Sequence, residues 1–369
     1  MSWPQLLCAD RFGLDRRVVP DPARSPYQID SDRIVFSSAF RRLQDKTQVF
    51  PLADNDFVRT RLTHSLEVSS VGRSLGARAG AEICRRHGLS PEFHASDFGA
   101  IVSAAALAHD LGNPPFGHSG EDAIRHWFHA SSSAQEARER ELTEVERTDF
   151  ERFEGNAQGF RLVTRLQMPD NPGLRLTCAT LGALTKYPRE SKLPTDAEPR
   201  GASGKKFGFF QSERKSFEMI AAKLGLLRRH PTGAWWARHP LAYLVEAADD
   251  ICYRLVDFED GFRLKHLDYE EVSESFLSVT QEAKDREVAK RLADEKERVA
   301  FLRARAIGAA VEQTAALFLE KEDAILRGEW DEPLLDHIPS GPALEEIRRR
   351  SVETIYATLR GVEIEAAGY

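Results

Sequence analysis

The sequence lacks the features that mark secreted and membrane-spanning proteins. It has 4 cysteines in 369 residues, far apart and without a CxxC pair, which argues against a disulfide framework and a thiolate zinc site. No run approaches the ~18 uninterrupted apolar residues of a membrane span, and the first residues show neither the basic lead nor the apolar run of a signal peptide. We therefore expect reduced thiols, no membrane partner and a cytoplasmic location.

Basic residues are also too few for a general polyanion-binding surface. Lys and Arg number 51 against 58 Asp and Glu, a formal net charge of -7. Any phosphate that the protein binds must therefore be met by a local cluster of cations. With 41% hydrophobic and 30% charged residues, the composition is that of a globular chain with one large core or two modest ones, which excludes disorder as its main character.

Apolar residues recur three and four apart along nearly the whole chain, and the alternation typical of strands is scarce. This periodicity predicts an all-α protein. One stripe, which runs from Leu66 through Val71 to Ile83, predicts a helix that Gly88 ends.

Two further helices are expected after this one. Ser96 is predicted as the N-cap of a helix that must stop by the Gly-Asn-Pro-Pro run at 112–115. The next helix is predicted to begin near Ser119, with Asp122 in the position of a capping box.

Two polar stretches interrupt the helical pattern. Residues 131–152 are nearly all polar, which predicts a solvated helix or a loose loop, and residues 188–206 contain Pro, Gly, Ser and charge with scarcely an apolar side chain. We expect both to be mobile insertions that contribute nothing to a core. The domain prediction is a core of residues 1–265 that carries these insertions, and a helical C-terminal region, residues 266–369, that packs on it.

Two histidines and two aspartates form the strongest candidate constellation. His109 and Asp110 are adjacent at the end of a predicted helix, where both side chains can turn to one divalent cation and the carbonyl end favours positive charge. His64 near the start of an earlier helix and Asp249 within a later one complete the set. Such ligands suit Mn, Fe, Co, Ni or Zn, and Mg through substrate oxygens.

The helix that contains Asp249 carries a polar face. Glu246, Asp249, Tyr253 and Asp257 lie at steps of three and four residues, so they share one side of a strongly apolar helix. Burying such a stack is costly unless a cation or a ligand meets it. A solvated acidic surface and a ligand-binding face are equally good interpretations of this pattern.

Six runs of the sequence resemble, in order, motifs of the dGTP triphosphohydrolase branch of the HD-domain metal-dependent phosphohydrolases. They are RTRLTHSLEV (59–68), HDLGNPPFGHSGE (109–121), FEGNAQGFR (153–161), KYPRES (186–191), KFGFFQSE (206–213) and LVEAADDICYRLVDFEDG (244–261). The long motifs are far more specific than a His-Asp pair.

The resemblance implies an all-α enzyme with one catalytic divalent metal. Its activity would be the cleavage of deoxynucleoside triphosphates (dNTPs) to deoxynucleoside and tripolyphosphate, with dGTP the first substrate to test. The implied ligands are His64, His109, Asp110 and Asp249, with Asp250 as the rival of Asp249 if the register slips.

His118 and Glu121 are interpreted as the proton-transfer pair. Hydrolysis at the α-phosphorus expels a 5′-alkoxide, a poor leaving group, so the site needs a Lewis acid, an activated water and a proton donor. A histidine backed by a carboxylate is such a donor, which makes His118 the acid and Glu121 its orienting base, in line with the resemblance. Without the motif, a turn histidine bonded to a backbone carbonyl would be the preferred interpretation of His118.

Phosphate contacts are predicted for charged residues around these motifs. Arg61 can reach an α-phosphate oxygen, and Lys186 and Lys206, at the two ends of the second polar stretch, can neutralise the outer phosphates. Each lysine alone is usually only a surface charge. The resemblance adds Lys186 with Tyr187, Lys206 and Asn156 as phosphate or sugar contacts.

Sugar contacts are predicted on two segments. Gln48 and Val49 resemble the sugar-sensing pair of the family. Tyr253 would pack against C2′ and leave no room for a ribose hydroxyl, while Asp257 would accept a hydrogen bond from the 3′-OH.

The chain departs from the family pattern in two places. Asn113 stands where many relatives have a second histidine, so a mechanism that uses a titratable group there does not apply. The final residues, VEIEAAGY, end in what resembles a mid-helix context, which suggests a truncation.

Partners and alternatives complete the interpretation. The resemblance implies a homo-oligomer, a hexamer, with single-stranded DNA or a second dNTP as an effector. One alternative is an HD phosphodiesterase or nuclease, against which the acidic net charge argues. The other is a dNTP-binding sensor with weak catalysis, which would have no need of His118 and Glu121.

Overall fold

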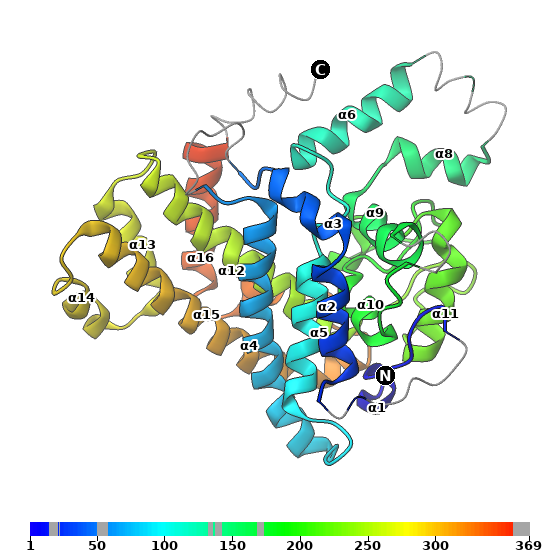
Figure 1. Ribbon diagram of the computed structural model, residues 1–369, viewed down its shortest axis with the longest axis horizontal. Helices are drawn as coiled ribbons and strands as arrows, with labels where there is room; N and C mark the ends of the chain where they lie inside the picture. Colours follow the sequence, from blue (N-terminus) through cyan, green and yellow to red (C-terminus); the bar gives the residue numbers. More distant parts are fainter. Residues whose placement is uncertain are drawn as a thin grey trace.

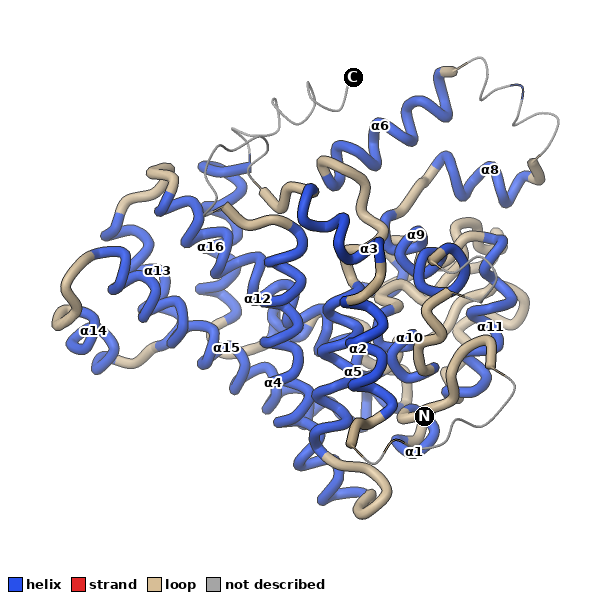
Figure 2. The backbone as a smooth tube through the Cα atoms, viewed as in Figure 1, coloured by secondary structure: helices blue, strands red, loops and turns tan. Residues whose placement is uncertain are grey.

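The computed structural model describes residues 1–14, 21, 23–49, 58–131, 136, 142–167 and 173–356. Within these residues the chain is helices joined by loops and turns, and it has isolated β-bridges but no strand (Figure 1 and Figure 2). The prediction of an all-α protein is confirmed. The helices are α1 (Trp3–Leu6), α2 (Pro26–Val35), α3 (Ser38–Arg41), α4 (Arg61–His87), α5 (Ala95–Ala108), α6 (Gly117–Ala130), α8 (Glu144–Glu151), α9 (Gly155–Arg161), α10 (Cys178–Leu184), α11 (Arg214–Leu224), α12 (Pro240–Arg263), α13 (Tyr269–Thr280), α14 (Ala283–Ala289), α15 (Glu295–Leu326) and α16 (Gly341–Ser351).

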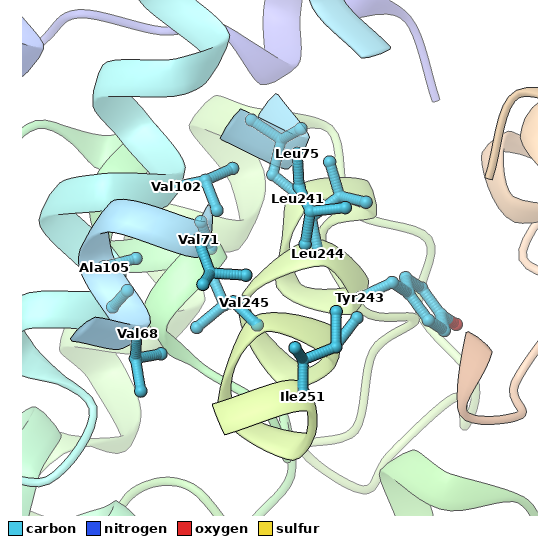
Figure 3. Packing of buried hydrophobic residues seen from close by; sticks show 14 of the residues in the cluster. Val68, Val71, Leu75, Val102, Ala105, Leu241, Tyr243, Leu244, Val245 and Ile251 are labelled. Carbon is cyan, nitrogen blue, oxygen red and sulfur yellow. The ribbon is translucent and has the colours of Figure 1, made fainter. Parts of the chain in front are cut away.

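Helices α4, α5 and α12 pack together at the centre of the molecule. Figure 3 shows their buried side chains facing one another: Val68, Val71 and Leu75 from α4, Val102 and Ala105 from α5, and Leu241, Leu244, Val245 and Ile251 from α12. Tyr243 points away from this cluster, and its hydroxyl donates to the carbonyl of Trp330 at 2.6 Å.

Small residues allow α4 and α5 to approach closely. A Cβ atom on Gly76 of α4 would lie 2.6 Å from the carbonyl oxygen of Phe98 on α5, closer than van der Waals contact permits. A Cβ atom on Gly80 would similarly meet the Phe98 ring and Cβ. The spacing of the two helices therefore depends on glycine at these positions.

The end of α4 lies where the sequence predicts it. Thr60 caps the N-terminus by accepting from the Thr63 N–H. At the other end, Gly88 has φ +59° and ends the helix in the left-handed conformation that glycine adopts without a steric penalty.

The predicted N-caps of the next two helices are wrong by two and three residues. Helix α5 begins at Ala95 rather than after Ser96, because the Asp97 carboxylate accepts from the backbone N–H of His94 and thereby caps the helix earlier. Helix α6 begins at Gly117, so Ser119 is inside it and is not its N-cap.

The first polar stretch is only partly described. Its residues Glu144–Glu151 form α8, and the Thr143 side chain accepts from the Glu146 N–H at the helix start. The predictions for residues 132–135 and 137–141 lie outside the described residues.

The second polar stretch is not the loose insertion that the sequence predicts. Glu190 and Ser191 are buried: the Ser191 hydroxyl donates to Asp149 at 2.6 Å, and the Glu190 carboxylate accepts from the Ala234 N–H at 2.7 Å. Composition missed this because hydrogen bonds to distant segments, rather than apolar area, hold the stretch in place.

The C-terminal helices lie along the central ones. Helix α15 packs against α4, α12 and α13, and α16 packs against α12. Buried apolar residues from Trp3 to Ile355 form one continuous cluster that includes both regions of the chain. Among the described residues, each helix is too short or too polar to cross a bilayer.

We expect Gly76→Ala to lower the free energy of unfolding by about 2 kcal/mol, because the added Cβ would meet the backbone of α5. Gly308→Ala is the matched control: a Cβ at this exposed position of α15 meets nothing within 4 Å, so the substitution should stabilise the protein by about 0.5 kcal/mol through its helix propensity. Urea unfolding of both variants measures the difference. Equal effects would contradict the close-packing argument.

Candidate metal centre and its pocket

Three side chains from the three central helices meet at one point. His64 of α4, His109 at the end of α5 and Asp249 of α12 each offer a ligand atom, and these atoms all lie within 4.8 Å of one another. His64 Nε2 is 3.1 Å and His109 Nε2 is 3.5 Å from the same oxygen, Asp249 Oδ1. Helix packing therefore brings together residues that are up to 185 positions apart.

A backbone hydrogen bond orients one of the two histidines, His109, whereas Nδ1 of His64 is buried without a hydrogen-bond partner among the described residues. His109 Nδ1 is 2.7 Å from the carbonyl oxygen of Ala106. Because a carbonyl can only accept, Nδ1 carries a proton, which leaves Nε2 as the ring nitrogen that a metal ion could bind once it has lost its own proton. Two imidazoles and a carboxylate that converge in this way fit a divalent cation.

Charge in the cluster favours a cation. Burial lowers the pKa of His109, but the carboxylates of Asp110 and Asp249 outweigh this effect and raise it to about 9. Burial raises the pKa of Asp249, but His109 and His64 outweigh this effect and hold it well below its ordinary value. The carboxylate of Asp249 is therefore ionised and stabilised by positive charge at this point.

Asp110, the fourth predicted ligand, lies beside this group of three. Its Oδ1 is 3.5 Å from His109 Nε2, but it also accepts from Asn113 Nδ2 at 2.5 Å, and its Oδ2 accepts from the Arg61 guanidinium at 2.5 Å. Arg61, which the sequence assigns to an α-phosphate, thus pairs with Asp110 in this structure. Asn113 had no predicted role, although its position three residues after Asp110 is a signal that could have revealed the contact.

A pocket of about 550 Å³ opens over this cluster, a volume in the range of small-molecule sites. Nearly all of the predicted site residues line it: Gln48, Val49, Arg61, His64, His109, Asp110, His118, Glu121, Asn156, Lys186, Tyr187, Lys206, Asp249 and Tyr253. Asp257 is not among the lining residues, and its side chain is 0% exposed. Glu246 and Asp250 also line the pocket, so much of the polar face of α12 is directed to it.

Two buried oxygens in the pocket have unused hydrogen-bonding capacity. Glu121 Oε1 accepts from the Gly155 N–H at 2.6 Å, whereas its Oε2 has no hydrogen-bond partner among the described residues. Gln48 Oε1 is likewise buried without such a partner in the described part of the chain. Buried polar atoms of this kind are commonly satisfied by a ligand, a water or a small movement of a neighbour.

His118 lies between charges of both signs. Burial lowers the pKa of its imidazole, and the positive charge of Lys206 acts in the same direction, while the carboxylate of Glu121 opposes both. The net result is a pKa below the ordinary value of histidine.

Each of the two predicted phosphate lysines faces a buried carboxylate. Lys186 Nζ is 3.3 Å from Glu246 Oε1, and Lys206 Nζ is 3.1 Å from Glu154 Oε2. Sequence reasoning missed Glu154, since no periodicity connects it to a lysine 52 residues later. The sequence pattern placed Glu246 on the polar face of α12 but did not identify Lys186 as its partner.

The turn after Asp110 and the helix α9 are in close contact. A Cβ atom on Gly112 would lie 2.0 Å from the Gly155 carbonyl oxygen and 2.1 Å from the Gly159 nitrogen. A Cβ atom on Gly155 would in turn lie 2.2 Å from Asn113 Oδ1. Glycine at these positions lets α9, which carries Asn156, lie directly against the turn that follows His109 and Asp110.

Comparison with known proteins gives the same assignment as the sequence motifs. The HD domain family matches residues 61–157, which contain His64, His109 and Asp110 but not Asp249. A deoxyguanosinetriphosphate triphosphohydrolase-like protein of Synechocystis sp. is 47% identical over all of this chain and 83% of its own length.

Two other relatives extend this similarity. A protein of the same description from Pseudomonas aeruginosa is 47% identical over 93% of this chain and 76% of its own length. The deoxyguanosinetriphosphate triphosphohydrolase of Yersinia pseudotuberculosis is 33% identical over 95% of this chain and 76% of its own length. The chain therefore belongs to the deoxyguanosinetriphosphate triphosphohydrolase family of HD-domain proteins.

Proposed function

We propose that this protein hydrolyses deoxynucleoside triphosphates, dGTP first among them, to deoxynucleoside and tripolyphosphate. The observation that carries the proposal is the pocket itself, in which a three-residue metal cluster, a histidine next to a carboxylate, and two lysines line one cavity. The names of the relatives support the same substrate class.

His64, His109 and Asp249 would hold one divalent metal ion, with Asp110 next to them as the fourth ligand. When bound there, a divalent ion would supply Lewis-acid chemistry for a phosphoryl oxygen and for the attacking water. Mn, Fe, Co, Ni, Zn and Mg are all compatible with imidazole and carboxylate ligands together with substrate oxygens.

His118 would deliver the proton that the leaving group needs. In the proposed reaction the oxygen of water forms a bond to the α-phosphorus, the bond from that phosphorus to O5′ breaks, and O5′ takes a proton from the imidazolium. Glu121 Oε2, buried without a hydrogen-bond partner among the described residues, is suited to orient the imidazole and stabilise its charge. The attacking water releases a proton to solvent, from which the His118 imidazole is protonated again, and the oxygen of the water leaves as part of tripolyphosphate.

The remaining lining residues would bind the substrate. Lys186 with Tyr187 and Lys206 would contact the outer phosphates, and Arg61 would reach the α-phosphate from its place beside Asp110. Gln48, Val49 and Tyr253 would contact the sugar.

The domain organisation and the assembly of the protein are also proposed. Residues 1–265 would form the catalytic region and 266–369 its helical support. A hexamer, with single-stranded DNA or a second dNTP as effector, remains the proposed assembly.

The proposed chemistry is tested by its products. Purified protein incubated with each dNTP and each of several divalent metals should release deoxynucleoside and tripolyphosphate, separated by ion-exchange chromatography. Pyrophosphate with a deoxynucleoside monophosphate would contradict cleavage between the α-phosphorus and O5′, and turnover of a bis(4-nitrophenyl) phosphate diester alone would indicate a phosphodiesterase.

Substitution of His118 should separate metal binding from turnover. We expect His118→Ala to lower kcat by about 10²–10⁴-fold, because the 5′-oxygen loses its proton donor, and to leave metal affinity unchanged. Asp249→Ala should lose both metal binding and turnover, because it removes the carboxylate that faces His64 and His109. Metal titration calorimetry and kcat of the two variants measure this, and full turnover by His118→Ala would rule out its role as the acid.

The pH profile should respond to Lys206. Protonated His118 is the proposed active form, so kcat should fall as pH rises through its pKa. Because Lys206 contributes to lowering that pKa, Lys206→Gln should move the descending limb of the profile to higher pH. The control is Lys205→Gln at the exposed neighbouring position, which should leave the limb in place. If the descending limb of the kcat profile of Lys206→Gln is unchanged or moves to lower pH, His118 is not the group that the limb reports.

A further inference from the structure

Arg238 lies behind the pocket wall and contacts both a pocket lysine and its carboxylate partner. Its side chain does not line the pocket and the residue is 1% exposed. Nη1 and Nη2 donate to the two carboxylate oxygens of Glu246 at 2.7 and 3.4 Å, and Nε donates to the backbone carbonyl of Lys186 at 2.8 Å. One guanidinium therefore holds the carboxylate that faces Lys186 and the main chain from which Lys186 extends.

These contacts fix Lys186 at two points. Its main chain is bonded directly to Arg238, and its ammonium group is 3.3 Å from Glu246 Oε1. The guanidinium itself lies near the rings of Tyr187, at 5.8 Å, and Tyr243, at 5.2 Å, distances at which a cation is attracted to an aromatic face.

The combined charge of Lys186, Glu246 and Arg238, which form a triad, affects how strongly the pocket attracts an anionic ligand. Lys186 and Glu246 alone would cancel, and their pair would present no net charge to a phosphate. With the guanidinium of Arg238 the triad carries one net positive charge. Burial raises the pKa of Glu246, but Arg238 and Lys186 outweigh this effect and lower it, so the carboxylate stays ionised between two cations.

Stability alone is a weak reason for such a triad. A buried ion pair often contributes little more than well-packed apolar residues would, because desolvation offsets its attraction. Ordering a lysine side chain on binding, in contrast, costs rotamer entropy, and lysine is among the side chains that lose the most. A lysine that is already held before the ligand arrives avoids part of that cost.

The second pocket lysine lacks this arrangement. Lys206 faces Glu154, which accepts from Arg125 at 3.2 Å, but the Arg125 side chain is 26% exposed and donates to the carbonyl of Phe153 rather than to that of Lys206. Of the two pocket lysines, only Lys186 thus has, within the described part of the chain, an arginine that binds both its main-chain carbonyl and the carboxylate that its side chain faces.

We propose that Arg238, acting through Glu246 and the main chain, is a positioning residue that holds Lys186 in place for the triphosphate of the substrate. The proposal rests on the proposed function of the pocket, and it extends that function to a residue that touches neither the substrate nor the metal cluster.

A double-mutant cycle of Arg238→Lys and Lys186→Ala tests the proposal. Arg238→Lys keeps the charge but loses the forked donor geometry. We expect about a tenfold rise in KM for the dNTP with kcat changed less than about twofold, and the same rise in the dissociation constant of inorganic tripolyphosphate measured by calorimetry. In the Lys186→Ala background, Arg238→Lys should cause no further rise, because the lysine that it positions is gone.

Arg11→Lys is the matched control for loss of a buried arginine. Arg11 pairs with Asp30 at 2.6 Å, their side chains are 2% and 0% exposed, and neither residue lines the pocket. This variant should lower the melting temperature and leave KM and tripolyphosphate binding unchanged. If Arg238→Lys does not fold, Glu246→Asp completes the same cycle, because it keeps the charge and shortens the side chain that links Arg238 to Lys186; tripolyphosphate binding should again weaken in a way that depends on Lys186.

Three results would overturn the proposal. The first is that Arg238→Lys and Lys186→Ala raise the dissociation constant of tripolyphosphate by independent factors that multiply in the double variant. The second is that a folded Arg238→Lys protein binds tripolyphosphate as tightly as the wild type or more tightly. The third is that the wild-type protein does not bind tripolyphosphate. Failure of the proposed function looks different: wild-type protein that binds tripolyphosphate but releases none from any dNTP would contradict the activity, while the binding cycle would still measure the role of Arg238.

Discussion

The packing of α4 against α5 brings two of the candidate metal ligands together. His64 lies near the start of α4 and His109 directly after α5, and their imidazole ring centroids are 5.4 Å apart. Helix α12 then adds Asp249 from a third side. The cluster is thus a product of tertiary packing, and the carboxylates and imidazoles stabilise one another once that packing has formed.

Charge is arranged around the pocket in opposed pairs. Arg61 faces Asp110, Lys186 faces Glu246 and Lys206 faces Glu154, each at hydrogen-bonding or ion-pair distance. A chain with more acidic than basic residues thus keeps three cations at one pocket, and Arg238 adds a further positive charge behind its wall. The pairing also explains why these acidic residues tolerate burial.

Sequence patterns predicted what depends on neighbouring residues and missed what depends on contacts across the fold. Periodicity was enough for the all-α fold, and Gly88 for the end of α4. The start of α5 was misplaced because the Asp97 side chain caps it, and residues 188–206 were misjudged because their partners, such as Asp149 and Ala234, are distant in sequence. Long motifs named most of the residues that line the pocket, but nothing local connects Arg238 to Lys186, 52 residues earlier.

The contact between Gly112 and α9 has a mechanical consequence. With no side-chain atoms between the two backbones, a residue larger than glycine at position 112 would push the turn that follows His109 and Asp110 away from the helix that carries Asn156. The part of the pocket formed by α12 and the segment around Lys186 is held differently, by side-chain contacts of Glu246 and Arg238.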